Sequence, residues 1–302
     1  MRISTSGNGR IISVRIRSIS EDRQHYGVIV PLLKWAGGKR QLRSELTSRL
    51  PDRWGTYFEP FIGGGALLVE LANLGRLDRA VIGDKNPELV NLYRVVKQDP
   101  EGLFAALSDA KFRNDDESFR LLRAEFNTLI GTRKRPVDRA ALLVYLNKHS
   151  YNGLWRVNRK GHYNVPFGKY TRLSLPSSQS LQKFSRMLAG VTLMNADFEQ
   201  IVRTAKRGDF IYFDPPYHPL SKTARFTDYT TGGFSFEDQQ RLAREFRRLS
   251  ERGVRIMLSN SCTTEIKDLY EDFSIQTVTA KRFINCKGER RSGASELIIT
   301  NY

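Results

Sequence analysis

The chain alternates between short apolar runs and longer segments in which apolar residues recur every three to four positions. From residue 56 onward the short runs have the length and composition of buried strands, and the longer segments have the period of amphipathic helices. The predicted strands are Tyr57–Phe61, Ala80–Gly83, Val191–Met194, Phe210–Phe213, Val254–Leu258 and Glu296–Thr300. The predicted helices are Ala66–Asn73, Pro87–Lys97, Phe119–Leu129, Pro136–Asn147, Leu181–Leu188, Phe236–Ser250 and Thr264–Tyr270. Strands separated by helices predict an α/β fold with a mainly parallel sheet covered on both faces.

The alternation is interrupted between residues 110 and 178. This stretch offers two helical patterns and then a segment rich in Gly, Asn and Tyr, so we interpret 110–178 as an inserted, mainly helical domain. Residues 28–109 and 179–302 would then form one catalytic domain. Residues 1–27 carry scattered Arg, Ser and Gly and predict a flexible basic extension, with a short strand at Ile11–Ile16 as the alternative.

The net charge says more about the binding partners of this chain than its composition does. The 302 residues carry a formal net charge of +17, which attracts polyanions, and nucleic acid is the first candidate. A basic but unengaged surface and a membrane-associating one are the alternatives. No apolar run is long enough to span a membrane, and the N-terminal segment lacks the apolar core of a secretory signal. The two cysteines and four histidines follow no metal-ligand spacing, so we expect no metal and a cytoplasmic, nucleoid-associated protein.

The segment from Tyr57 to Leu68 predicts a strand, a glycine turn and the start of a helix. Glycine lets the backbone turn sharply and approach a ligand closely. Asp84 ends the next strand, nineteen residues after Gly65, where an acid can accept both hydroxyls of a ribose. A dinucleotide fingerprint would need a tiny residue at Leu68, whereas a Phe-x-Gly-x-Gly turn suits S-adenosyl-L-methionine (AdoMet), which has no pyrophosphate. A plain strand-to-helix turn is the alternative. The candidate cofactor contacts in the turn are Pro60, Phe61, Gly63 and Gly65.

Two other segments carry weaker signals for the same cofactor. Lys34-Trp-Ala-Gly-Gly-Lys39 can fold over an anionic group, and Lys39 can pair with the carboxylate of the cofactor's methionine part; an ordinary glycine turn with a solvated lysine explains the same residues. In Asn195-Ala-Asp-Phe198, Asp197 can accept from the adenine amine with Phe198 against the ring, or it can cap a helix.

The most specific signal is Asp214-Pro-Pro-Tyr217, which directly follows a strongly apolar strand. An exocyclic amine on a base is a poor nucleophile, and acceptors aimed at its two N–H bonds stabilise the charge that develops as it attacks a methyl donor. Asp214 can accept one N–H and the Pro215 carbonyl the other, with two prolines holding the backbone. Tyr217 can stack on a base taken out of its helix. The alternative is a turn without chemistry, since Asp and Pro both favour turns. The candidate catalytic residues are Asp214, Pro215, Pro216 and Tyr217.

The predicted insert is basic and aromatic. From Lys134 to Arg172 there are nine Lys or Arg and a single acidic residue, Asp138. Aromatic residues interleave at Tyr145, Tyr151, Trp155, Tyr163, Phe167 and Tyr170. Cations meet phosphates and rings stack or wedge between bases, so this pattern favours nucleic-acid contact over a solvated charged surface. Arg156 is a candidate for a bidentate contact with guanine, and Arg133 with Lys134 can contact phosphates or lie in a solvated loop.

In order along the chain, these motifs resemble those of Dam-type DNA adenine-N6 methyltransferases, the α-group (D12 class) amino methyltransferases. The resemblance runs from residue 33 to 302 and rests on Lys34-Trp-Ala-Gly-Gly-Lys39, Phe58-Glu-Pro-Phe-Ile-Gly-Gly-Gly65, Gly83-Asp-Lys-Asn86, Tyr151-Asn-Gly-Leu-Trp-Arg-Val-Asn158, Gly161-His-Tyr-Asn-Val-Pro-Phe-Gly-Lys-Tyr170, Asp214-Pro-Pro-Tyr217 and Glu296-Leu-Ile-Ile-Thr-Asn-Tyr302. It implies a Rossmann-like AdoMet-dependent fold whose insert is a target-recognition domain carrying a β-hairpin.

The resemblance also implies roles for single residues. Cofactor contacts are implied at Trp35, Lys39, Asp84, Asp197 and Asp214. Base reading is implied for Lys34, Leu154, Arg156, Pro166 and Tyr170, with Tyr151 wedged into the duplex and Asn152 and Lys169 as further DNA contacts of the same motifs. The implied target is adenine within GATC in double-stranded DNA, and we expect a monomer or a weak dimer. A cytosine-N4 or RNA methyltransferase and a non-catalytic DNA-binding regulator are the competing hypotheses.

Overall fold

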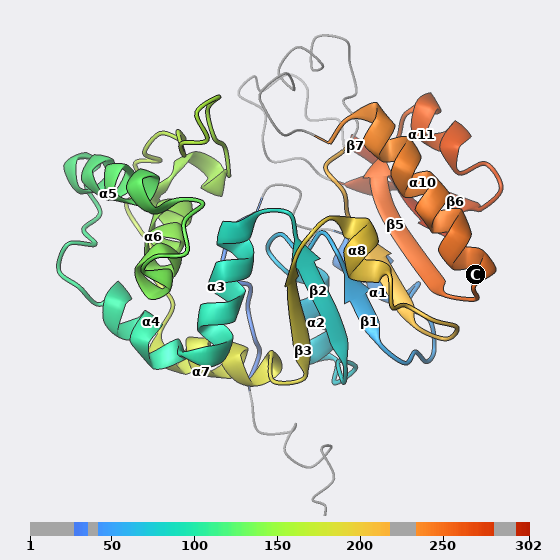
Figure 1. Ribbon diagram of the computed structural model, residues 1–302, viewed down its shortest axis with the longest axis horizontal. Coiled ribbons are helices and arrows are strands. Elements are labelled where there is room, and N and C mark those ends of the chain that lie inside the picture. The colour runs from blue at the N-terminus through green and yellow to red at the C-terminus, as the bar shows by residue number, and fades with distance from the viewer. Residues whose placement is uncertain (1–26, 36–41, 218–233, 281–293) are drawn as a thin grey trace, which may run out of the picture.

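A computed structural model describes residues 27–35, 42–217, 234–280 and 294–302. The short strand considered at Ile11–Ile16 lies outside these ranges. The centre is a seven-stranded sheet with the order β3-β2-β1-β4-β5-β7-β6 (Figure 1). The strands are β1 Tyr57–Glu59, β2 Ala80–Asp84, β3 Val191–Asn195, β4 Phe210–Phe213, β5 Arg255–Ser261, β6 Ser274–Ala280 and β7 Ala294–Thr300. Strands β1 to β5 pair in parallel, and β7 runs antiparallel between β5 and β6, which confirms the mainly parallel α/β fold.

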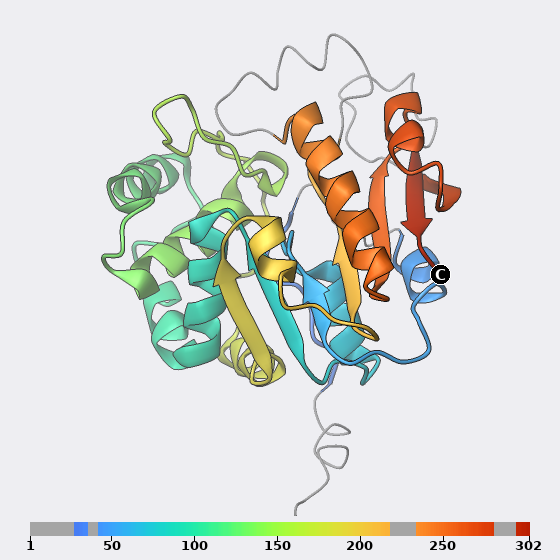
Figure 2. The ribbon, with the colours of Figure 1, turned by 45° about the vertical axis from the view of Figure 1, so that its right-hand side comes forward.

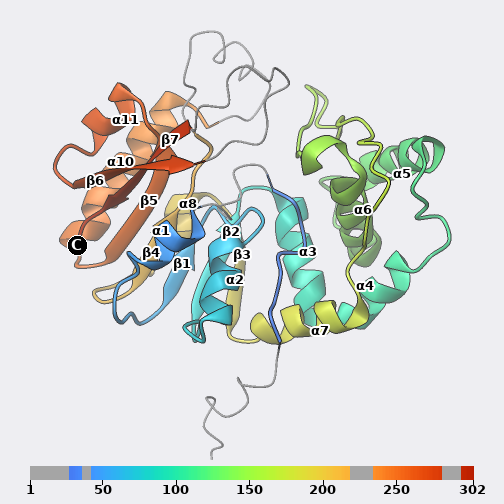
Figure 3. The same cartoon turned by 180° about the vertical axis from the view of Figure 1, so that it is seen from behind.

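Helices cover both faces of the sheet. They are α1 Arg43–Thr47, α2 Ala66–Asn73, α3 Pro87–Gln98, α4 Pro100–Leu107, α5 Asp116–Leu129, α6 Pro136–His149, α7 Ser178–Met187, α8 Phe198–Val202, α10 Phe236–Glu251 and α11 Thr264–Leu269, with a 3-10 turn at Tyr151–Gly153. Figures 1 and 2 show α8 and α10 along one face, and Figure 3 shows α1 and α2 on the other. Along β4, Phe210 and Tyr212 join the core on the α2 side, while Ile211 and Phe213 join the core on the α10 side. This alternation is the pleat of a strand buried on both faces.

Four elements were not predicted, and each has a physical reason. Strand β6 alternates apolar and polar residues too weakly to stand out, and its register with β7 supplies the backbone hydrogen bonds that hold it at the edge. Helices α1 and α8 have five residues each, fewer than two turns. A single residue, Asp99, separates α3 from α4, and its side chain accepts the backbone N–H of Gly102 and caps the new helix.

Helices α4, α5 and α6 pack beside α3 and α7, beyond the β3 edge of the sheet (Figure 1). Their buried side chains belong to the same apolar cluster as those of α2 and α3. The helical region therefore shares a continuous core with the sheet, and its orientation is fixed by packing.

The predicted hairpin is present as two isolated antiparallel bridges, Ser150 with Phe167 and Val157 with Tyr163. Its tip closes with the backbone N–H of Asn158 donating to the carbonyl of His162. Helix α5 supports one arm, because the Asn127 side chain makes two hydrogen bonds with the backbone of Tyr163, of 2.8 and 3.1 Å. The hairpin is thus held by side chains from α5 as much as by its own backbone pairing.

In the described ranges, the helices are either too short or too polar to cross a bilayer.

Candidate active site and nucleic-acid interface

Four acidic side chains gather where the parallel strands end. Glu59 ends β1, Asp84 ends β2, Asp197 follows β3 and Asp214 follows β4. The carboxyl ends of parallel strands lie along one edge of a sheet, so this edge is where the fold places a ligand. Asp84, Asp197 and Asp214 were candidates from the sequence, whereas Glu59 stood only inside a predicted strand and the glycine motif, without a role of its own.

The glycine turn lies directly against Trp35. Gly63 and Gly65 have φ angles of 44° and 65°, in the left-handed region that other residues adopt only with strain. A Cβ added to Gly63 would lie 2.7 Å from the indole of Trp35, and one added to Gly64 would lie 2.9 Å from the Trp35 Cβ. The turn therefore needs glycine both for its backbone and for the close approach of Trp35. Lys39, the other cofactor candidate from this segment, lies outside the described residues.

Asp84 is bound to the glycine turn by backbone hydrogen bonds. Its carboxylate accepts the backbone N–H of Gly63 at 3.2 Å and that of Asn86 at 2.9 Å. Burial raises the pKa of Asp84 to about 6, so the carboxylate is ionised at neutral pH and can accept hydroxyl protons. Two residues further on, the side-chain Nδ2 of Asn86 is buried and makes no hydrogen bond to the described residues. A ligand oxygen or a bound water would satisfy that donor.

Glu59 is a buried acid with a displaced pKa. It is 3% exposed, and the Tyr57 hydroxyl donates to its carboxylate at 2.8 Å. Burial raises the pKa of Glu59 to about 8, and the nearby charge of Asp214 adds to the shift. At neutral pH Glu59 therefore keeps its proton while Asp214 stands beside it.

Two neighbouring carboxylates favour a cationic ligand. AdoMet carries an ammonium and a sulfonium group, and positive charge beside Glu59 would favour the ionised form of Glu59 next to the Asp214 carboxylate. The chemistry of this donor set therefore fits AdoMet. The described residues contain no group of three or more His, Cys, Asp or Glu side chains that could hold a metal ion.

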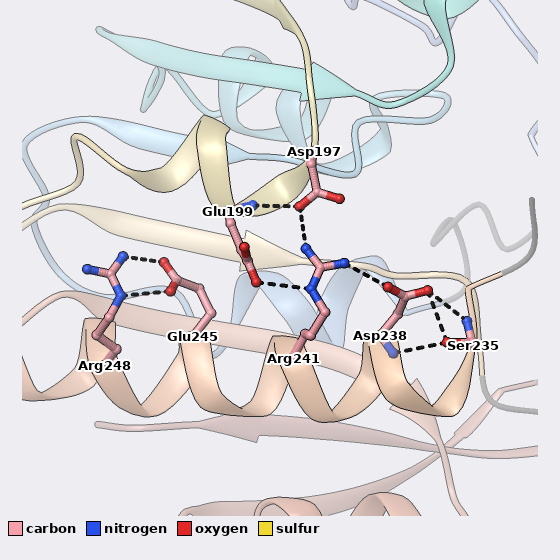
Figure 4. Close-up of polar contacts among 7 residues, drawn as sticks. All are labelled: Asp197, Glu199, Ser235, Asp238, Arg241, Glu245 and Arg248. Atoms are coloured by element: carbon pink, nitrogen blue, oxygen red, sulfur yellow. Dashed lines mark hydrogen bonds and ion pairs between the residues drawn. The ribbon is translucent and has the colours of Figure 1, made fainter.

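Asp197 is fixed by an arginine that the sequence analysis did not select (Figure 4). Its Oδ1 accepts the backbone N–H of Glu199 at 3.2 Å, which caps α8, and the guanidinium of Arg241 at 3.0 Å. Arg241 also binds the carboxylates of Glu199 and Asp238, and these partners raise the pKa of Arg241. The capping role considered for Asp197 is present, and Arg241 on α10 holds the carboxylate in place beside the sheet edge.

An aromatic cluster lies between the glycine turn and α8. The ring of Phe61 lies 5.5 Å from those of Phe198 and Phe234, and Phe198 lies 6.0 Å from Phe234. The Arg241 guanidinium sits 5.0 Å from the Phe198 ring, in cation–π contact. The cluster brings together Phe61 and Phe198, which were chosen from separate motifs in the sequence, and Phe198 is buried within it at 3% exposure.

The Asp214-Pro-Pro-Tyr217 loop is held by partners from two other elements. Tyr217 donates its hydroxyl to Glu296 of β7 at 2.6 Å, and the side chain of Gln239 on α10 donates to the carbonyl of Pro216 at 3.0 Å. Neither proline has a backbone N–H, so Pro215 and Pro216 cannot themselves donate a backbone hydrogen bond. From the sequence, Glu296 was part of a predicted strand and of the C-terminal motif, and Gln239 was part of a predicted helix; neither had a role assigned to its side chain.

The start of the hairpin meets the segment that carries Lys34. The Asn147 side chain accepts the backbone N–H of Lys34 at 2.8 Å and donates to the Lys34 carbonyl at 2.7 Å. The Lys34 ammonium lies 4.5 Å from the centre of the Tyr170 ring, and the Tyr170 hydroxyl accepts the backbone N–H of Asn152 at 2.9 Å. Three DNA-contact candidates, Lys34, Asn152 and Tyr170, are thus brought together.

Arg156 is held in a defined orientation across the hairpin. Its Nε donates to the side-chain oxygen of Asn164 at 2.8 Å, and its Nη2 donates to the Asn164 carbonyl at 3.0 Å. The fork is exposed, which suits a contact with a base edge. Tyr151 is 43% exposed and Pro166 is exposed, while Leu154 is only partly buried.

The remaining DNA-contact candidates are Arg133, Lys134 and Lys169, and one further residue of the hairpin, Trp155, had no role assigned. Arg133 and Lys134 are exposed in the loop between α5 and α6, a different element from the hairpin, and Lys169 is exposed with a φ of 54°. Trp155, for which the sequence offered no role, stacks on Trp35 with ring centres 6.3 Å apart. The hairpin thereby contacts the tryptophan that covers the glycine turn.

Comparison with known proteins agrees with this arrangement. Residues 35–284 match the family described as D12 class N6 adenine-specific DNA methyltransferase. The chain is 42% identical over 274 residues to the Type II methyltransferase M1.LlaDCHI of Lactococcus lactis subsp. cremoris, covering 90% of this chain and 95% of the relative. It is 42% identical over 288 residues to the Type II methyltransferase M.MjaIII of Methanocaldococcus jannaschii, covering 91% and 99%. It is 38% identical over 274 residues to the DNA adenine methylase of Serratia marcescens, covering 88% and 96%. The chain therefore belongs to the D12 class of N6 adenine-specific DNA methyltransferases, a family of enzymes that implies AdoMet as methyl donor and DNA as substrate.

Proposed function

We propose that this enzyme takes an adenine out of duplex DNA and methylates its N6 within the sequence GATC. The observation that carries the proposal is the Asp214-Pro-Pro-Tyr217 loop, which follows β4 at the same sheet edge as Glu59 and Asp84. The proposed target adenine and the cofactor site would then share one edge of the sheet.

The proposed chemistry divides the work among three groups of the loop. The Asp214 carboxylate accepts one N–H of the adenine amine and the Pro215 carbonyl accepts the other, which favours the nucleophilic form of the nitrogen. The Tyr217 ring stacks on the base, with its hydroxyl anchored to Glu296. AdoMet supplies the electrophilic methyl group on a sulfonium, which makes a protein nucleophile unnecessary.

The proposed reading of GATC belongs to the hairpin and the segment next to it. Arg156 would contact guanine, with Lys34, Leu154, Pro166 and Tyr170 reading the remaining bases and Tyr151 filling the space left by the adenine. Asn152, Lys169, Arg133 and Lys134 would contact the DNA backbone and fix the register. Two contacts support this assignment: Asn164 holds the Arg156 guanidinium in one orientation, and the Lys34 ammonium lies over the Tyr170 ring.

For the cofactor we propose that Asp84 accepts the ribose hydroxyls, that Asp197 and Phe198 receive the adenine, and that Trp35 and the turn enclose the methionine part. The turn residues are Pro60, Phe61, Gly63 and Gly65. Lys39 would pair with the carboxylate of the cofactor. The Glu59 carboxylate would balance the charge of the ammonium group of AdoMet.

Glu59 gives a prediction for cofactor binding. With a pKa of about 8 it is protonated in the free enzyme at pH 7, and a cation bound beside it lowers that pKa, so AdoMet binding should release about one proton. Titration calorimetry in buffers of different ionisation enthalpy measures this release. Glu59→Gln should bind AdoMet more weakly and release markedly fewer protons on binding. Equal proton release by the two proteins would contradict the assignment.

The same pKa shift has a consequence for stability. A carboxyl whose pKa is raised by folding stabilises the folded state fully at low pH, and that contribution is lost as pH rises through about 8. The melting temperature of Glu59→Gln minus that of the wild type, both measured without AdoMet, should therefore increase between pH 6.5 and pH 8.5. A gap that does not change with pH would show that Glu59 does not titrate in this window.

The function is tested by incubating unmethylated plasmid with the purified enzyme and labelled AdoMet, then mapping the modified base and its sequence context. N6-methyladenine confined to GATC supports the proposal. N4-methylcytosine, or labelling of structured RNA in preference to duplex DNA, would favour the two competing methyltransferase hypotheses. DNA binding with no AdoMet binding would favour a non-catalytic regulator.

A further inference from the structure

The carbonyl of Pro216 is tied to the protein core by a buried amide. Gln239 donates to it at 3.0 Å from the first half of α10, and the Gln239 side chain is 0% exposed. The carbonyl belongs to the peptide that joins Pro216 to Tyr217, so fixing it fixes a peptide plane in the middle of the loop. Gln239 is thus placed to hold the loop between its two functional ends, Asp214 and Tyr217.

A second buried amide locks the first. The Asn260 side chain on β5, also 0% exposed, donates to the side-chain oxygen of Gln239 at 3.0 Å, and its own oxygen accepts the backbone N–H of Ser261 at 2.8 Å. The opposite orientation of the Gln239 amide would place two oxygens against each other at Pro216. The chain from Ser261 through Asn260 and Gln239 to Pro216 therefore has one consistent set of donors and acceptors.

This chain of amides lies among apolar side chains. Leu242, Ala243 and Phe246 of α10 and Leu258 of β5 belong to the surrounding core. Leaving a buried amide without its partner costs about 1–3 kcal/mol, whereas a fully satisfied buried network rigidifies what it holds. The two prolines fix their own φ angles but supply no backbone N–H, so the network adds a hydrogen bond that holds the Pro216 carbonyl from outside the loop.

We propose that Gln239 and Asn260 are positioning residues for methyl transfer. They fix the Pro216 peptide plane from two rigid elements, and this sets the direction of the adjacent Pro215 carbonyl relative to the Asp214 carboxylate. The inference rests on the proposed function, in which those two oxygens accept the N–H bonds of the target amine. Neither Gln239 nor Asn260 contacts substrate in this scheme.

Gln239→Met tests the proposal, because methionine keeps the length of the side chain and removes the donor. A small displacement of a reacting group costs about 100-fold in rate, so the single-turnover rate of methyl transfer should fall by about 10- to 100-fold. The dissociation constants for AdoMet, by calorimetry, and for DNA, by gel shift, should stay within about threefold. Because both residues act through one hydrogen-bond chain, Gln239→Met combined with Asn260→Leu should be no slower than Gln239→Met alone.

Gln239→Glu supplies a readout that a purely structural role would not give. A protonated glutamic acid can donate to the Pro216 carbonyl and accept from Asn260, whereas the ionised form cannot donate. The rate of Gln239→Glu relative to the wild type should therefore be highest at low pH and fall as pH rises. This variant keeps the shape of the core, so it serves also if Gln239→Met does not fold.

Asn301→Leu is the matched control. Asn301 joins the same two elements at their opposite ends: it accepts the backbone N–H of Ile256 at 2.8 Å and donates to the Val254 carbonyl at 2.8 Å and to the Ser250 hydroxyl at 2.9 Å. Its loss should lower the melting temperature and leave the single-turnover rate of the folded protein unchanged.

The outcomes separate the inference from the function on which it rests. A Gln239→Met enzyme that transfers methyl at the wild-type rate, or a Gln239→Glu enzyme whose relative rate does not change with pH, overturns the inference. A wild-type enzyme that methylates no adenine in DNA overturns the proposed function itself. If the wild type methylates DNA and Asp214→Ala does not, but both Gln239 variants behave as wild type, only the positioning role is lost.

Discussion

Asp214→Ala should reduce methyl transfer by at least about 100- to 1,000-fold, the range expected when one preorganised group at a developing charge is removed. In the proposed mechanism this carboxylate accepts an N–H bond of the target amine, and its neighbour Pro215 cannot take over that contact. The single-turnover rate on unmethylated duplex DNA measures the loss, and retention of DNA in a gel shift should largely survive. An Asp214→Ala enzyme with normal activity would show that the assigned chemistry is wrong.

Asp209→Asn is the control for Asp214, because it lies at the other end of the same strand. Asp209 is buried before β4 and accepts the backbone N–H of Thr56 at 2.8 Å and that of Lys206 at 2.9 Å. Its neutralisation should lower the melting temperature with little effect on the rate per folded molecule. Similar losses of rate in both variants would mean that any damage to β4 stops the enzyme.

Arg156→Ala should weaken the choice of target sequence by about 1–3 kcal/mol, the discrimination that a bidentate contact with a base gives. That free energy corresponds to a loss of about 5- to 150-fold in the preference for the cognate site. The measurement is the ratio of kcat/KM on the cognate duplex to kcat/KM on duplexes that differ at one base pair. An unchanged ratio would remove Arg156 from the set of base-reading residues.

Arg159→Ala tests whether charge alone explains such a result. Arg159 is exposed in the same hairpin and lies near its tip. A phosphate contact there should weaken binding to all duplexes by a similar factor and reduce its dependence on salt. Asn164→Ala should fall between the two arginine variants in site preference, because it removes the side-chain acceptor of the Arg156 Nε and keeps the backbone carbonyl that accepts from Nη2.

The sequence predicted the parts of the site that a local pattern can encode. A strand followed by glycines, by an acid or by Asp-Pro-Pro-Tyr is visible along a few residues, and Asp84, Gly63 and Tyr217 were found in this way. The order of the strands was not predicted, and β6 has too weak a pattern to be separated from a loop.

The supporting residues could not be predicted, because their roles depend on contacts between distant segments. Arg241 meets Asp197 from 44 positions away, and Tyr217 meets Glu296 from 79 positions away. On a single helix, Gln239 and Arg241 look like ordinary polar positions of an amphipathic pattern. Glu59 had a signal that could have been used, an acid at the end of an otherwise apolar strand.

The stacking of Trp155 on Trp35 limits how this enzyme could acquire a new recognition sequence. The hairpin residues Tyr151 and Arg156 are exposed, so, in the proposed function, they can be exchanged without altering the glycine turn. Trp155 of the hairpin and Asn147 of α6 instead contact the segment that carries Lys34 and Trp35, and Trp35 lies against the glycine turn. Libraries aimed at altered specificity should therefore vary the exposed positions and keep Trp155 and Asn147, since changes there would sacrifice turnover together with selectivity.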